Sequence, residues 1–170
     1  MVFALAIIAA FAATQASSTL SDVAIACRDP SDIAQTKLNV QNRGWSYAST
    51  EKQSIFDREI SVAQHPEDKL AVTMSVFEKS DIPNLLLIVG EEREADGFWM
   101  RSCILRDPAK QAVTDLASVK AAFSLGTHEY DEAGPAYLWE LWDANLTYTL
   151  YLDPKDDGVN GLIIQKYGRD

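Results

Sequence analysis

Hydrophobic and polar residues alternate with a period of two in several stretches of this chain, a pattern that predicts strands. Residues 70–77 alternate most clearly, and residues 98–105 follow the same pattern. Residues 85–89 form an unbroken apolar run, as expected for a strand that is covered on both faces. Residues 55–63 alternate more loosely, and we predict a weaker strand there.

The C-terminal part of the chain is the richest in aromatic residues. Residues 137–142 and 146–152 alternate on either side of a short turn at Asp143, Ala144 and Asn145, which predicts a hairpin. Turn-forming residues then lead into a last predicted strand over residues 162–167.

Two other stretches have helical spacing of their apolar residues. Asp29 and Asp107 are each followed by proline, and an aspartate before a proline is a common helix start. We therefore predict helices over residues 29–42 and 107–122. The second has the stronger apolar stripe, and Gly126 is predicted to end it.

The order of these elements predicts an α+β fold, an antiparallel β-sheet with two helices on one face. Asp107 follows Asp29 by 78 residues (107 minus 29), and the later strands match earlier ones at about this spacing. The match suggests a tandem α-β-β-β duplication as a hypothesis. Its halves would be residues 27–96 and 97–170, and the strand over residues 97–105 would bridge them.

The first sixteen residues are almost wholly apolar and end in small residues, which is typical of a signal peptide cut before Ser17. The segment is shorter than the roughly 20 apolar residues that span a membrane. Lipid attachment at Cys27 is an alternative that the residues before it fit poorly. We expect a periplasmic or secreted protein with a single domain over residues 17–170, and no stable membrane span once the signal is removed.

Cys27 and Cys103 are the two cysteines of the chain. In an exported protein such a pair is expected to form a disulfide, which would stabilise the fold by about 4 kcal/mol in the chain-entropy model. Two reduced, buried thiols are the alternative. A Cα separation above about 7 Å would exclude the disulfide.

The charge of the chain excludes one class of function. There are 15 lysines and arginines against 25 aspartates and glutamates, for a formal charge of −10. Binding to nucleic acid requires clustered cations, so we expect no nucleic-acid partner. An acidic protein is steered toward basic partners, although many exported proteins are acidic for no specific reason.

Motifs for catalysis are sparse. The two histidines, His65 and His128, lie far apart without metal-ligand spacing, and no phosphate loop or dinucleotide fingerprint is present, so we predict no metal and no cofactor. Ser49 and Lys52 match the S-x-x-K motif of acylating enzymes without its companion motifs. A small hydrolase or metal-dependent enzyme using the polar loop from His128 to Asp131 is the alternative function.

The hairpin over residues 137–152 suggests a binding surface instead. Its aromatic residues fall on both sides of the predicted sheet, and only one side is needed for the core. The other side would carry Trp142, Tyr151 and Glu140, a combination of aromatic and charged side chains that suits binding hot spots. The alternative is that a loop, the other half of the sheet or a dimer mate covers this face. We predict an exported, non-enzymatic protein that binds an unknown protein or cell-envelope component through this face.

Overall fold

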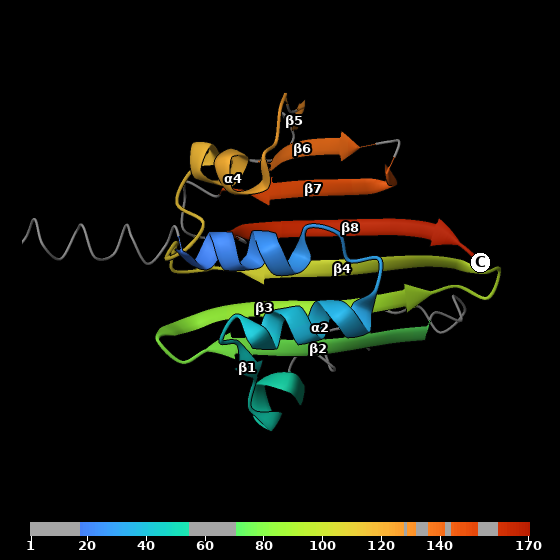
Figure 1. The fold of residues 1–170 in the computed structure, drawn as a ribbon, viewed down its shortest axis with the longest axis horizontal. Coiled ribbons are helices and arrows are strands. Elements are labelled where there is room, and N and C mark those ends of the chain that lie inside the picture. The colour runs from blue at the N-terminus through green and yellow to red at the C-terminus, as the bar shows by residue number, and fades with distance from the viewer. Residues whose placement is uncertain (1–17, 55–70, 128, 132–135, 142–143, 153–159) are drawn as a thin grey trace, which may run out of the picture.

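The chain folds around one antiparallel β-sheet. The structure is a computed structural model, and it describes residues 18–54, 71–127, 129–131, 136–141, 144–152 and 160–170. Over these residues eight strands form the sheet in the order β1-β2-β3-β4-β8-β7-β6-β5 (Figure 1). The predicted α+β class with an antiparallel sheet is confirmed.

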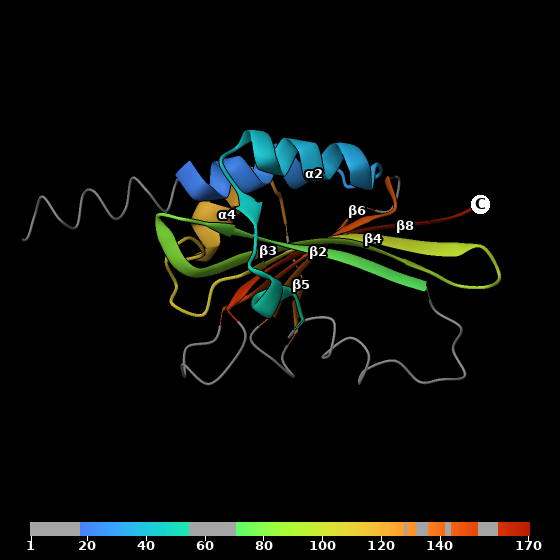
Figure 2. The ribbon, with the colours of Figure 1, turned by 90° about the horizontal axis from the view of Figure 1, so that it is seen from below.

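The strands are β1 (Ser46–Tyr47), β2 (Ala71–Lys79), β3 (Ile82–Arg93), β4 (Phe98–Arg106), β5 (Glu129–Asp131), β6 (Ala136–Leu141), β7 (Leu146–Tyr151) and β8 (Gly161–Arg169). The helices are α2 (Ile33–Asn42) and α4 (Leu116–Phe123), together with helical segments over residues 18–27 and 50–54. Figure 2 shows the 18–27 helix, α2 and α4 on one side of the sheet. The predicted strand over residues 55–63 lies outside the described residues.

The prediction that Asp29 caps the first helix was wrong. The helix begins four residues later, and the N-cap is Asp32, whose carboxylate accepts a hydrogen bond from the Gln35 backbone N–H at 3.0 Å. Asp29 instead accepts from the Ser31 backbone N–H at 3.1 Å, so it stabilises a turn before the helix. The predicted end is confirmed, since α2 stops at Asn42.

The second helix also begins later than predicted, and Asp107 is not its cap. The buried Asp107 carboxylate accepts hydrogen bonds from the backbone N–H groups of Gln111, Ala112 and Val113 at 2.7 to 2.8 Å, and so fixes a loop. The N-cap is Asp115, which accepts from the Ser118 N–H at 2.8 Å. The helix ends at Phe123, before the predicted Gly126.

The helix starts do not follow the 78-residue spacing, so the duplication stays a hypothesis. Asp32 and Asp115, the two N-caps, are 83 residues apart (115 minus 32). The strand over residues 97–105 was expected to bridge two halves, and β4 lies at the centre of the sheet, paired with β3 on one side and β8 on the other. The order of elements does repeat, as α2-β1-β2-β3-β4 and then α4-β5-β6-β7-β8.

Register divides the sheet into two faces. On the helix-covered face, cross-strand rows of apolar side chains meet the 18–27 helix, α2 and α4. One row is Phe77, Leu87, Leu105, Leu162, Leu150 and Tyr137, and the next is Ser75, Val89, Cys103, Ile164, Tyr148 and Trp139. These rows form the main core. The hairpin residues that belong to this core or pack against it are Tyr137, Trp139, Leu146, Tyr148, Leu150 and Leu152.

A disulfide joins the 18–27 helix to the centre of the sheet. Cys27 and Cys103 are bonded, their Cα atoms are 6.0 Å apart, and both are fully buried. The predicted pairing therefore passes its geometric test. The bond fixes the last turn of the helix against β4, within the main core.

Candidate functional sites

The face of the sheet opposite the 18–27 helix, α2 and α4 is here called the second face, and it has one continuous row that is apolar except for Thr149. This central row crosses six strands and consists of Val76, Ile88, Ile104, Ile163, Thr149 and Leu138. At one end Val76 and Ile88 are buried, whereas the remaining members are only half-buried. The row is thus covered at β2 and β3 and accessible toward β6.

The covered end of the central row explains the Ser49–Lys52 motif. Ala48 packs against Val76 and Ile88, and the Gln53 side chain accepts a hydrogen bond from the Val76 N–H at 3.0 Å. Lys52 pairs with Glu78 at 2.5 Å, and its N–H lies 3.4 Å from the Ser49 hydroxyl. The Lys52 side chain is thus directed to Glu78 on β2, and the contact between Lys52 and Ser49 runs from the Lys52 backbone N–H.

Two of the three predicted binding residues flank the central row. Tyr151 lies in the neighbouring row beside Gly161, and Glu140 lies in the row on the opposite flank, beside Thr147. Both are half-buried. Glu140 and Tyr151 are therefore on the predicted face but on opposite sides of its apolar row. Trp142, the third predicted residue, lies outside the described residues.

Adjacent glutamates of β3 occupy opposite faces and differ in pKa. Burial raises the pKa of Glu92, which is on the second face. For Glu91, burial alone would raise the pKa, but hydrogen bonds from Arg93 and Arg101 outweigh burial and lower it. Both glutamates lie within β3, which continues past the apolar run to Arg93.

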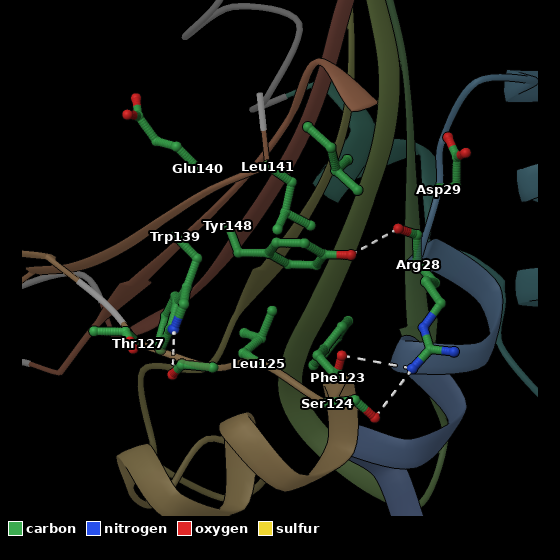
Figure 3. Close-up of a pocket in the computed structure, with 12 residues that line it drawn as sticks. Arg28, Asp29, Phe123, Ser124, Leu125, Thr127, Trp139, Glu140, Leu141 and Tyr148 are labelled. Carbon is green, nitrogen blue, oxygen red and sulfur yellow. Dashed lines mark hydrogen bonds between the residues drawn. The ribbon is translucent and has the colours of Figure 1, made fainter. Parts of the chain in front are cut away.

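On the helix-covered side, a cavity of about 590 Å³ opens beside the end of α4 (Figure 3). Its walls come from the turn after the 18–27 helix, the end of α4 with the residues that follow, β6 and β7. The lining residues are Arg28, Asp29, Phe123, Ser124, Leu125, Gly126, Thr127, Trp139, Glu140, Leu141, Leu146 and Tyr148. The size is in the range of small-molecule and side-chain pockets.

The floor of this cavity is buried, and its polar atoms are hydrogen-bonded. Phe123, Trp139, Leu146 and Tyr148 are each at most 5% exposed. The Tyr148 hydroxyl donates to the Arg28 carbonyl at 2.8 Å, and the Trp139 indole N–H donates to the Gly126 carbonyl at 3.4 Å. Burial also raises the pKa of Tyr148, so the hydroxyl remains a donor. The floor presents an apolar surface.

Asp29, at the rim of the cavity, is held by its own ion pair. The Lys166 ammonium lies 2.9 Å from the Asp29 carboxylate. Burial alone would raise the pKa of Asp29, but the hydrogen bonds from Lys166 and Ser31 lower it. This pair ties the turn before α2 to β8, so Asp29 has a structural role.

The predicted enzymatic loop is only partly described. Glu129–Asp131 form the edge strand β5, paired with β6, and are not a loop as expected. His128 and His65 lie outside the described residues, so the catalytic alternative is untested. Among the residues with described positions, no cluster of three or more His, Cys, Asp or Glu side chains could hold a metal.

Comparison with known proteins identifies no relative. No protein-family model, no curated protein and no solved structure matches the chain. Within the described parts of the chain, no helix has the length and apolar character needed to cross a membrane.

Sequence reasoning missed the cavity. Its residues come from four segments that are distant in the sequence, and no local motif joins Arg28 to the end of α4. The one available signal was the helical spacing of Leu20, Val23, Ala24 and Cys27, which predicts a helix packed on the sheet directly before Arg28.

Proposed function

We propose that this protein is an exported, non-enzymatic binding protein that recognises another protein, or a cell-envelope component, through its second face. The observation that carries the proposal is the accessible half of the central row. Ile104, Ile163 and Leu138 are apolar and half-buried on the face opposite the 18–27 helix, α2 and α4, beyond the end of the row that Ala48 and the 50–54 segment cover. Apolar side chains left accessible in a continuous row favour a binding surface.

The flanks of the row suggest how a partner would be oriented. Tyr151 supplies an aromatic ring on one flank, and Glu140 supplies a carboxylate on the other. Interfaces combine an apolar centre with a polar rim, and aromatic residues are enriched among their hot spots. We expect the partner to present an apolar ridge with a basic group near Glu140, in keeping with the formal charge of −10.

Export is supported by two features. Residues 1–16 have the composition of a signal peptide, and Cys27 and Cys103 form a disulfide. Structural disulfides persist mainly in oxidising compartments, so the periplasm or the extracellular space is the proposed location.

Affinity capture from the envelope and secreted fractions of the source organism tests this proposal. The baits are the unaltered protein, a Tyr151→Ser plus Ile163→Ser variant, a Trp142→Ser variant and a Leu38→Ser control. Leu38 is 53% exposed on α2, on the other side of the sheet, so the control removes an accessible apolar side chain elsewhere. Circular dichroism establishes that every bait is folded.

The expected result is a stoichiometric partner that the unaltered protein and the Leu38→Ser control retain and the Tyr151→Ser plus Ile163→Ser variant loses. Truncating hot-spot side chains typically weakens binding by at least about 2 kcal/mol, or roughly 30-fold. Equal retention by all folded baits would contradict a role for the second face. Capture of no partner by the unaltered protein would contradict the protein-binding proposal.

A further inference from the structure

The cavity beside α4 has an apolar floor and a cationic rim, an arrangement that selects a particular ligand chemistry. Phe123, Trp139, Leu146 and Tyr148 form the buried floor. Because the Tyr148 hydroxyl and the Trp139 indole N–H already donate to backbone carbonyls, the floor gains little from a polar ligand group. The part of a ligand that enters the cavity is therefore apolar.

Arg28 provides the charge at the rim. Its Nη2 atom lies 3.3 Å from the Ser124 hydroxyl and 3.5 Å from the Phe123 carbonyl, and Figure 3 shows both contacts beside the end of α4. Both acceptors are neutral. Among the described side chains, no carboxylate lies within ion-pair distance of Arg28. Both contacts of Arg28 with the end of α4 use Nη2, so the guanidinium has further N–H donors for a ligand.

The two acidic residues of the lining do not compete for this role. Asp29 is paired with Lys166. Glu140 lies between Trp139 and Leu141 on β6, so its side chain belongs to the second face, and Figure 3 shows it directed away from the cavity. Among the described lining residues, Arg28 is therefore the cation that a carboxylate entering the cavity would meet.

We propose that this cavity binds the C-terminal residue of a partner polypeptide, with a large apolar side chain on the floor and the α-carboxylate at Arg28. A C-terminal residue carries both groups on one carbon atom, and its chain leaves in one direction only. Arginine binds a carboxylate through two parallel hydrogen bonds, which makes it the suitable cation.

The mouth of the cavity favours a polypeptide over a lipid. Ser124, Gly126 and Thr127 are exposed there, and Leu141 is 44% exposed on the rim. These groups can contact the backbone and side chains of preceding ligand residues, whereas a long acyl chain requires a continuous apolar enclosure. The cavity lies on the opposite side of the sheet from the second face, so this inference does not rest on the function proposed above.

Two matched peptides test the inference on the full chain. One is Gly-Gly-Gly-Phe with a free C-terminus, and the other is the same peptide with a C-terminal amide. Binding is followed by two-dimensional ¹H–¹⁵N NMR, using the Trp139 indole signal, assigned with a Trp139→Phe variant, and the Leu125 and Gly126 amides. We expect the free acid to shift these signals and to bind at least about tenfold more tightly than the amide.

Three variants identify the groups responsible. Arg28→Gln is expected to abolish the preference for the acid, whereas Arg43→Gln, which removes an exposed cation at the end of α2, should retain it. Leu141→Ser should weaken both peptides equally. Since Arg28 also contacts the end of α4, the acid-to-amide comparison on the unaltered protein carries the test without any variant.

Three results would overturn the inference: equal affinity of the unaltered protein for both peptides, no binding of either peptide at millimolar concentration, or shifts that map away from the cavity. A preference that survives Arg28→Gln would also overturn it. None of these results depends on the second face, so each can be told apart from failure of the proposed function.

Discussion

The two faces of the sheet use the same strands but bury them to different extents. Leu162, Ile163 and Ile164 follow one another on β8, and the two that face the helices are at most 1% exposed, whereas Ile163 on the second face is only half-buried. The helix-covered face has two adjacent apolar rows sealed by helices. The second face has one. One face is thus sealed within the main core, whereas part of the other face remains in contact with water.

The faces also differ in how they hold charge. On the helix-covered face, Arg93 and Arg101 neutralise Glu91 at 2.5 and 2.6 Å. Arg101 also stacks on Trp99, 4.3 Å from the ring centroid, and donates to the Ser31 carbonyl before α2. Glu92, the neighbour of Glu91, lies on the second face, and burial alone raises its pKa. On the helix-covered face, Arg101 thus links the turn before α2 to the sheet.

Removing the disulfide should cause the largest loss of stability, because it lies wholly within the helix-covered core. The separation of 76 residues predicts that Cys27→Ala plus Cys103→Ala lowers the free energy of unfolding by about 4 kcal/mol. Denaturant unfolding followed by circular dichroism measures this loss. A loss below about 1 kcal/mol would show that the helix is held without the covalent bond.

Truncation of neighbouring β8 residues should separate the faces directly. Leu162→Ala leaves a cavity in the main core and should lower the free energy of unfolding by about 2 to 5 kcal/mol. Ile163→Ala, on the second face, should cause a smaller loss of unfolding free energy, by at least about 1 kcal/mol, than Leu162→Ala. The reason is that the Ile163 side chain is already partly in contact with water. Equal losses would mean that the second face is as well packed as the first.

The β3 glutamates should give the smallest effects, with opposite signs. The pKa of Glu91 is depressed below its usual 4.5, so its stabilising contribution is present above that pH and is lost as the pH falls through the folded-state pKa. Glu91→Gln should therefore lower stability at pH 7 by about 1 kcal/mol and weaken the acid dependence.

The pKa of Glu92 is raised above 4.5, so the folded protein favours its protonated form. Its contribution is favourable below that pH and is lost as the pH rises through the raised pKa. Glu92→Gln should raise stability slightly at pH 7. Thermal unfolding of both variants from pH 3 to 8 measures these changes in stability. If both substitutions changed the stability at pH 7 in the same direction, the environments assigned to Glu91 and Glu92 would be contradicted.

The sequence predicted strands and their faces better than it predicted helix starts. Period-two alternation identified β2, β4, β6 and β7, because successive side chains of a strand point to opposite faces and their polarity follows the burial of each face. Asp29 and Asp107 misled the helix prediction, since an aspartate before proline caps a turn or a loop as readily as a helix. Only the tertiary structure distinguishes these uses.

The candidate sites depended on tertiary structure to different degrees. Tyr151 and Glu140 could be assigned to one face from alternation, but their separation by the central row required the register of β7 with β8. The position of Arg28 beside the end of α4 joins residues 95 positions apart, and no local pattern encodes it.

The central claim is that the second face is accessible in the folded protein, and thiol labelling tests it most directly. Ile163→Cys and Ile164→Cys each add one thiol to a chain whose own cysteines are bonded to each other. In native buffer a maleimide should label Ile163→Cys within about tenfold of the rate for an exposed Leu38→Cys control, while Ile164→Cys should react only on unfolding. Protection of Ile163→Cys equal to that of Ile164→Cys would show that the second face is covered, and would contradict the account.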